Sequence, residues 1–119
     1  MLEQFGAVNF QRGVASIVVL SLLKQADLYG YQLVQEMERQ SLGALRMQEG
    51  ALYPVLYKLQ DAGYISSERV QVGKRMTRVY YHLEPEGAVY LERLVRDYKA
   101  VVNGVFDIVE GRNREKPDQ

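Results

Sequence analysis

The chain has 119 residues, and its 15 basic and 15 acidic side chains give a formal net charge of zero. A hydrophobic share of 47% and a charged share of 25% fit one globular domain with its own core and exclude wholesale disorder. The absence of cysteine excludes disulfides, thiolate metal sites and a thiol nucleophile.

The first expected element is a helix over residues 11–25, preceded by residues 1–10, which form either a loose arm or a frayed helix start. Apolar side chains cover most of the circumference of this helix, so it should be buried on more than one side, and a second subunit could supply part of that cover. The β-branched run at 17–19 would also suit a buried strand, but the length of the segment favours a helix.

The apolar stretch 14–23 in this helix is too short to span a bilayer and is interrupted by Ser16 and Ser21. It lacks the basic leader and small-residue cleavage site of a signal peptide. We therefore expect a cytoplasmic protein without membrane contact.

A second helix is expected over residues 28–41, with Asp27 as its N-cap and Gly43 as its stop. Gly30 lowers helix propensity in the first turn, so another segment is expected to pack closely there. Tyr31 could reach a phosphate from this helix N-terminus, or its ring could pack in the core.

The third helix, over residues 48–62, has two contrasting faces. Leu52, Val55, Leu56, Leu59 and Ala62 recur at steps of three and four and form an apolar stripe. The opposite face gathers hydroxyls, an amide and a cation: Gln48, Ala51, Tyr53, Pro54, Tyr57 and Lys58. Such a face suits phosphates and base edges, although an ordinary surface helix with half-buried tyrosines would look similar.

Two features mark the ends of this third helix. Pro54 lacks an N–H and clashes one turn back, so the helix should begin shortly before it or bend there. Gly63 is expected to end it.

Two strands, over residues 64–72 and 77–83, flank the basic turn Gly-Lys-Arg-Met and predict a hairpin. Residues 58–82 carry five cations and two anions, which suits a local phosphate-binding patch, although a mixed solvated surface can give the same pattern. His82 is the only histidine and has no nucleophile beside it, so neither an enzyme nor a metal or cofactor site is expected.

A long helix over residues 84–110 carries apolar side chains at alternating steps of four and three. These are Leu91, Val95, Tyr98, Val102, Val105 and Val109. We interpret the stripe as a dimerisation seam; the alternative is a helix that closes the core of its own domain. Residues 111–119 are polar and charged and are expected to be disordered.

The order of these elements predicts a mainly α fold with a small antiparallel β-hairpin, namely a winged helix-turn-helix with a coiled-coil-like C-terminal helix. Residues 1–83 would form the DNA-binding domain and residues 84–110 the dimerisation helix. The third helix would enter the major groove, and the hairpin would lie along the backbone or minor groove.

Three motifs carry a resemblance to the PadR family of transcriptional regulators, in its short form with one C-terminal helix. They are Tyr-Gly-Tyr-Gln-Leu at 29–33, Glu-Gly-Ala-Leu-Tyr-Pro-Val-Leu-Tyr-Lys-Leu at 49–59, and Arg-Val-Tyr-Tyr-His-Leu at 78–83 followed by Gly87. The chain departs from the family pattern at Ala51, Val79 and Glu84, which replace a threonine, a lysine and a capping threonine. These departures bear on the base preference of the third helix and on the contact between the hairpin and DNA, while the expected fold is unaffected.

The resemblance implies a homodimer, in most members a repressor, that a small effector releases from a pseudo-palindromic operator in double-stranded DNA. The residues that it assigns to DNA contact are Tyr31, Gln48, Tyr53, Tyr57, Lys58, Lys74, Arg75 and Arg78.

Short members similar to this chain often bind flat aromatic or cationic compounds between the first helix and the long helices. Here Gly13, Ser16 and Ile17 would line that site, and Tyr98 stands where a tryptophan usually stacks on the ligand. Alternatively, Tyr98 only fills the dimer seam.

One rival interpretation is a winged-helix protein-interaction module without DNA binding, which the zero net charge and the changes at Ala51 and Val79 favour. The basic residues of the hairpin oppose it. RNA binding is less favoured, because no sheet suited to stacking bases is expected.

Overall fold

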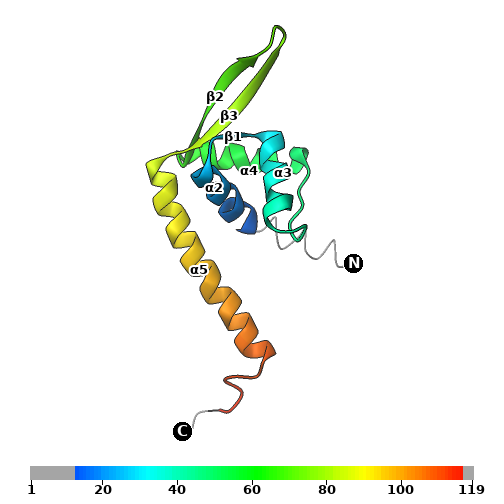
Figure 1. The fold of residues 1–119 in the computed structure, drawn as a ribbon. Coiled ribbons are helices and arrows are strands. Elements are labelled where there is room, and N and C mark those ends of the chain that lie inside the picture. The colour runs from blue at the N-terminus through cyan, green and yellow to red at the C-terminus, as the bar shows by residue number, and fades with distance from the viewer. Residues whose placement is uncertain (1–12, 117–119) are drawn as a thin grey trace.

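The computed structural model describes residues 13–116, in which helices and a small sheet form one body with two projections (Figure 1). The elements in chain order are α2 (Ala15–Gln25), β1 (Leu28–Tyr29), α3 (Gly30–Gln40), α4 (Glu49–Asp61), β2 (Ile65–Val72), β3 (Met76–Leu83) and α5 (Pro85–Val109). The β2–β3 hairpin, or wing, projects from one end of the body and α5 extends toward the other (Figure 1). The predicted arm at 1–10 and residues 11–12 of the first predicted helix lie outside the described residues.

The core lies where α2, α3, α4 and the base of the sheet meet, and the start of α5 closes it. Its fully buried side chains come from the apolar stripe of each element: Val19, Leu20, Leu33, Met37, Leu52, Leu56 and Ile65. Burying a large aliphatic side chain contributes about 1.5–3 kcal/mol, so these stripes fix the helices against one another. The predicted winged helix-turn-helix architecture with a long C-terminal helix is confirmed.

The predicted second helix, 28–41, is wrong at its start, because Leu28 and Tyr29 form a strand and α3 begins at Gly30. Leu28 pairs with Tyr81 and Tyr29 with Tyr80, which makes the predicted two-stranded hairpin a three-stranded sheet in the order β1-β3-β2. Tyr29, rather than Asp27, is the N-cap, and its backbone N–H donates to Oε1 of Gln32 at 3.2 Å. Cross-strand aromatic pairing thus replaces the first helical turn.

α4 contains Pro54 without losing its first turn. The backbone N–H groups of Ala51 and Leu52 both donate to the carbonyl of Gln48, at 3.0 and 3.2 Å, so the helix is established before the proline. Pro54 has no N–H to donate to the carbonyl of Gly50, one turn earlier in the helix. Gly50 is exposed, so water can hydrogen-bond to this carbonyl instead. At the other end Gly63 has φ of 82°, a conformation that glycine adopts without steric cost, and it ends the helix as predicted.

β2 and β3 pair over their full length, from Ile65 opposite Leu83 to Val72 opposite Met76, and a three-residue turn joins them. Alternate residues therefore face opposite sides of the wing. One side continues the core through buried Ile65 and Tyr81, and the same side carries Arg69 further out. Arg78 and Tyr80 belong to the other side.

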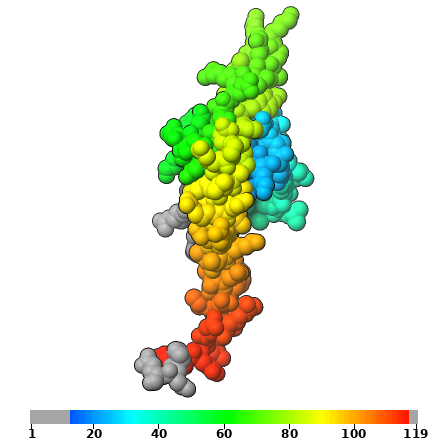
Figure 2. Space-filling view, turned by 90° about the vertical axis from the view of Figure 1, so that its left-hand side faces the viewer, coloured from blue at the N-terminus to red at the C-terminus, as the bar shows by residue number. Residues whose placement is uncertain are grey.

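α5 begins in the core and ends outside it. Leu91 is only 6% exposed, whereas Val105 and Ile108 are 51% and 83% exposed. The first half of α5 lies against the domain, and its orange second half extends below it (Figure 2). The radius of gyration is 17.5 Å, against about 13–14 Å for a compact chain of this length. The alternative interpretation, closure of the domain's own core, therefore holds for the first half of α5.

Residues 111–116 follow α5 without regular secondary structure, and the guanidinium of Arg112 lies 3.0 Å from the carboxylate of Glu110. The predicted disordered tail also includes residues 117–119, which lie outside the described residues. Within residues 13–116, none of the helices combines the length and apolar character needed to cross a bilayer.

Candidate nucleic-acid interface

Tyrosine side chains dominate the outer face of α4. The rings of Tyr53 and Tyr57 stack with their centroids 6.1 Å apart, which follows from their spacing of four residues on one helix. Tyr57 is 58% exposed, Tyr53 is half-buried, and both Gln48 and Lys58 are exposed. This face therefore offers aromatic surface, an amide and a cation to solvent.

Tyr53 is fixed from two sides and in turn supports Tyr57. Its hydroxyl donates to Oε2 of Glu49 at 3.1 Å, and a Cβ added at Gly30 would lie 2.7 Å from that hydroxyl oxygen. The close packing expected at Gly30 is therefore found, with Tyr53 as the neighbour. Burial, and then the hydrogen bond to Glu49, raise the pKa of Tyr53, so its hydroxyl stays protonated.

Tyr31 continues this surface onto α3. It occupies the first turn of α3, directly after Gly30, and is 51% exposed. This exposure shows that the ring of Tyr31 does not pack in the core. The N–H groups of the first turn of a helix favour anions, so Tyr31 lies at a position suited to a phosphate.

The basic residues of the wing divide into two groups. Lys74 and Arg75 are exposed in the turn at the tip. The guanidinium of Arg78 instead lies 4.5 Å from the ring centroid of Tyr29, which meets Tyr80 edge to face at 5.4 Å. Arg78 is therefore held against β1 on one side of the sheet, away from the two tip cations.

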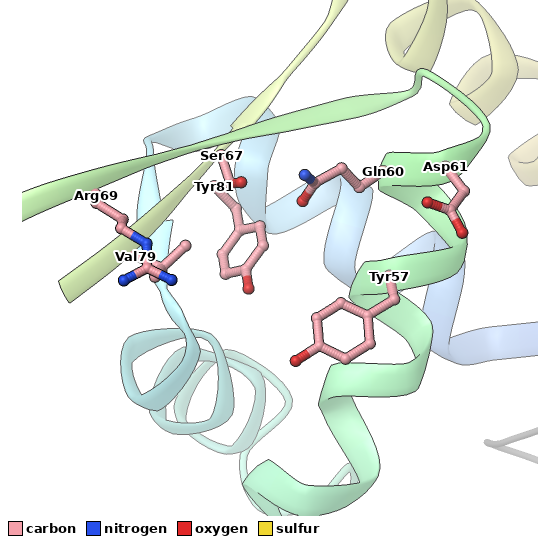
Figure 3. A pocket seen from close by; sticks show the side chains of 7 residues that line it. All are labelled: Tyr57, Gln60, Asp61, Ser67, Arg69, Val79 and Tyr81. Carbon is pink, nitrogen blue, oxygen red and sulfur yellow. The ribbon is translucent and has the colours of Figure 1, made fainter.

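A cleft of about 630 Å³ separates α4 from the wing (Figure 3). It is lined from α4 by Tyr57, Gln60 and Asp61 and from the sheet by Ser67, Arg69, Val79 and Tyr81. The hydroxyls of Tyr57 and Tyr81 point toward the same open space, with the Arg69 guanidinium beside Val79 (Figure 3). Of these seven residues, the sequence predicted only Tyr57 as a contact.

The register of the wing explains why Arg69 was missed. The pairs Ser67–Tyr81 and Arg69–Val79 place these side chains on the side of the sheet that faces α4. The alternation within 65–72 places Arg69 on the same side of the strand as Ile65. Within β2, only the buried Ile65 at the base of the strand indicates that this side faces α4.

His82 takes part in a surface ion pair. Its Nδ1 lies 2.8 Å from Oδ1 of Asp27, and its Nε2 lies 3.6 Å from Oε2 of Glu84. The hydrogen bond to Asp27 is the main cause that raises the pKa of His82. Among residues 13–116 there is no group of three or more side chains able to hold a metal ion.

A second groove, of about 730 Å³, runs between α2 and α5. Its lining residues are Ser21, Lys24, Gln25, Leu91, Glu92, Val95 and Arg96. None of the four predicted effector residues belongs to this set: Gly13 is exposed, Ser16 and Ile17 are half-buried on α2, and Tyr98 is 42% exposed on α5. Within one chain, the groove lies nearer the C-terminal end of α2 than the predicted site.

The predicted seam residues also divide along α5. Leu91 is buried against the domain, and Val95 and Val102 are partly covered. Val105 and Val109 are exposed. The outer residues of the seam therefore have no cover within the described part of the chain.

The sequence and the fold of this chain both resemble those of known proteins. Residues 19–93 match the profile of the transcriptional regulator PadR-like family. A transcriptional regulator of Mycobacterium tuberculosis is 34% identical over 105 residues, which cover 88% of this chain and 92% of the relative.

Solved structures agree with this match. A PadR family transcriptional regulator from Eggerthella lenta has a TM-score of 0.77 at 26% identity and covers 92% of this chain and 93% of its own. Bacillus subtilis PadR in complex with operator DNA shares the fold, with a TM-score of 0.65 at 24% identity, over 69% of this chain and 46% of its own.

Proposed function

The chain belongs to the PadR-like family of transcriptional regulators, and from this premise we propose that it is a dimeric, sequence-specific repressor that a small effector releases from DNA. Members of this family are transcriptional regulators and not enzymes. The observation that best supports DNA contact is the outer face of α4, where the exposed Tyr57 borders the cleft beneath the wing.

Charge supports the same surface. Lys58, Lys74 and Arg75 are all exposed on α4 and the wing tip. Glu49, an acid in the first turn of α4, already accepts the hydroxyl of Tyr53. A neutral protein thus carries a local cationic surface, which suits a short stretch of DNA better than a non-specific coat.

The winged-helix fold supports a specific binding geometry. α4 would enter the major groove with Gln48, Tyr53, Tyr57 and Lys58, while Tyr31 and the wing would contact the backbone. A twofold dimer would address half-sites about 34–36 Å apart. In this arrangement Arg78 acts by holding the wing against β1 through Tyr29 as well as by its charge.

The test is selection of DNA from a random-sequence pool by the full chain, followed by fluorescence anisotropy at several salt concentrations. We expect an enriched, pseudo-palindromic sequence whose affinity falls steeply with salt. Lys74→Gln/Arg75→Gln should weaken binding to all sequences. Arg93→Gln/Lys99→Gln on α5 removes the same charge and should not. If no sequence is enriched, the protein-interaction module becomes the better interpretation.

For effector release, the supporting observations are the groove between α2 and α5 and the exposed ring of Tyr98 nearby on α5. The chain has nine tyrosines and no tryptophan, so its intrinsic fluorescence reports on tyrosine alone. A planar acridinium dye should change this fluorescence and release the selected DNA in the wild type, and Tyr98→Ala should reduce both effects. Unchanged dye binding and release in Tyr98→Ala would contradict a stacking role.

A further inference from the structure

We propose that the cleft between α4 and the wing is a phosphate-binding site, in which Arg69 and the hydroxyls of Tyr57 and Tyr81 hold one backbone phosphate of bound duplex DNA. The inference rests on the proposed DNA-binding function. It adds a contact that joins α4 to the wing through a single anion.

Arg69 is the cation among the residues that line the cleft. It is exposed on β2, and its guanidinium lies beside Val79 at the edge of the open space in the cleft (Figure 3). Its neighbours in sequence, Glu68 and Val70, face the other side of the sheet with Tyr80 and Arg78. The wing thus separates this cation from the acid next to it in the chain.

No acid within residues 13–116 forms an ion pair with Arg69 at 4.0 Å or less. By contrast, Arg39, Arg46 and Arg112 each pair with a glutamate. A guanidinium carries five N–H donors in a planar fork that fits two phosphate oxygens at once. Arg69 is therefore free to bind an external anion.

The two tyrosines supply further donors. The ring of Tyr81 is buried in the base of the sheet, while its hydroxyl opens into the cleft toward Tyr57 (Figure 3). Burial, followed by the proximity of Tyr57, raises the pKa of Tyr81, so this hydroxyl remains protonated and able to donate. Arg69 and Tyr81 line the cleft from the sheet and Tyr57 lines it from α4, so donors border the open space on both walls (Figure 3).

Asp61 lines the same cleft as Arg69 but carries the opposite charge. Among the lining residues of the cleft it is the only acid, and it stands at the end of α4. Its negative charge weakens binding of any anion in the cleft. Replacing it and replacing Arg69 should therefore change DNA affinity in opposite directions.

The experiment compares Arg69→Gln with Arg93→Gln, a matched loss of one guanidinium on α5, using the duplex that the wild type selects. Each phosphate contact adds about 0.9 to the slope of log affinity against log salt. We expect Arg69→Gln to lower that slope by about 1 per protomer, or about 2 for a dimer, while sequence preference is unchanged. Arg93→Gln should keep the wild-type slope.

Two further variants test the cleft without removing the guanidinium. Tyr81→Phe keeps the buried ring and should weaken binding to a smaller extent, and Asp61→Asn should strengthen it. Thermal melts of each variant check that the fold is intact. If the wild type binds DNA and Arg69→Gln matches Arg93→Gln in affinity and slope, the inference is overturned while the proposed function stands. If the wild type selects no DNA, both are overturned.

Discussion

Gly87, in the first turn of α5, fits its position because it has no side chain. A Cβ at this position would collide with the carbonyl oxygen of Tyr64 and lie 2.8 Å from Cδ1 of Leu83. The same carbonyl accepts the N–H of Glu84, the N-cap of α5, at 3.0 Å, so it cannot move without loss of the bond that ties the residue before β2 to the start of α5. At the scale of the residue, this glycine sets how closely α5 approaches the sheet.

We therefore expect Gly87→Ala to destabilise the fold by about 2–3 kcal/mol, in the upper part of the usual range for overpacking. Gly104→Ala is the matched control on the same helix, because nothing lies within 4 Å of a Cβ added there. That change should stabilise by up to about 1 kcal/mol through helix propensity. Urea unfolding monitored by circular dichroism measures both. Equal effects of the two substitutions would contradict the contact at Tyr64.

His82 should make stability depend on pH. Its pKa is raised from the ordinary 6.5, first by the hydrogen bond to Asp27. A raised pKa in the folded state means that the stabilisation is fully present below pH 6.5 and is lost as the pH rises through the folded value. Wild type and His82→Gln should therefore differ more in unfolding free energy at about pH 5.5 than at about pH 8. A difference that is larger at the higher pH would contradict the pair.

At the scale of the element, β1 shows how a two-residue strand can organise a larger structure. Tyr29 caps α3, meets Tyr80 edge to face and lies beneath the guanidinium of Arg78. These contacts tie the start of α3 to the outer side of the wing. The wing is thus attached to the helical body along both sides of its base.

Tyr29→Ala should loosen the wing, because it removes the ring against which Tyr80 and Arg78 rest. We expect a loss of roughly 1–2 kcal/mol from the aromatic and cation–π contacts together. Hydrogen exchange of the amides in 76–83 should accelerate. Tyr29→Phe keeps the ring and should exchange at nearly the wild-type rate. If the alanine variant exchanges no faster than the phenylalanine variant, the ring has no role in holding the wing.

The sequence predicted the long elements well and the short one wrongly, for a physical reason. Apolar stripes of eleven or more residues identify a helix through their period, so the expected 48–62 and 84–110 lie within one residue of α4 and α5 at each end. A two-residue strand has no period, and the Asp27 pattern before an apolar run suggested a cap instead. β1 exists only because Tyr80 and Tyr81 are there to pair with it.

The part of the candidate site on α4 could be predicted from the sequence, whereas the part on the wing could not. Residues on the outer face of α4 follow from helical spacing, so the exposure of Tyr57 could be anticipated. Arg69 and Arg78 were both visible as wing cations, but their assignment to opposite sides depends on register and on which side meets α4. Val79 replaces a lysine of the family pattern, and the structure places Arg69 directly across from Val79 on the neighbouring strand.

At the scale of the whole molecule, the principal extents of 72 × 34 × 20 Å describe a body drawn out by the wing and α5. The two projections differ in chemistry. The wing ends in exposed Lys74 and Arg75, whereas the far half of α5 exposes Val101, Val105 and Ile108. One end is suited to an anionic partner, and the other carries apolar surface that water solvates poorly.

A second copy of the chain would cover that apolar surface. Val105→Glu places a charge in the exposed part of the predicted seam, where its desolvation should oppose association. Val89→Glu is the matched control, because Val89 is 69% exposed on the first half of α5 and lies outside the seam. Sedimentation equilibrium should find a dimer for the wild type and Val89→Glu and a shift toward monomer for Val105→Glu. Because two half-sites need two copies of α4 held at a fixed distance, Val105→Glu should also lose affinity for the selected duplex. The duplex should therefore raise the melting temperature of Val105→Glu less than that of the wild type. A Val105→Glu protein that remains dimeric would contradict the placement of Val105 in the interface between the two copies.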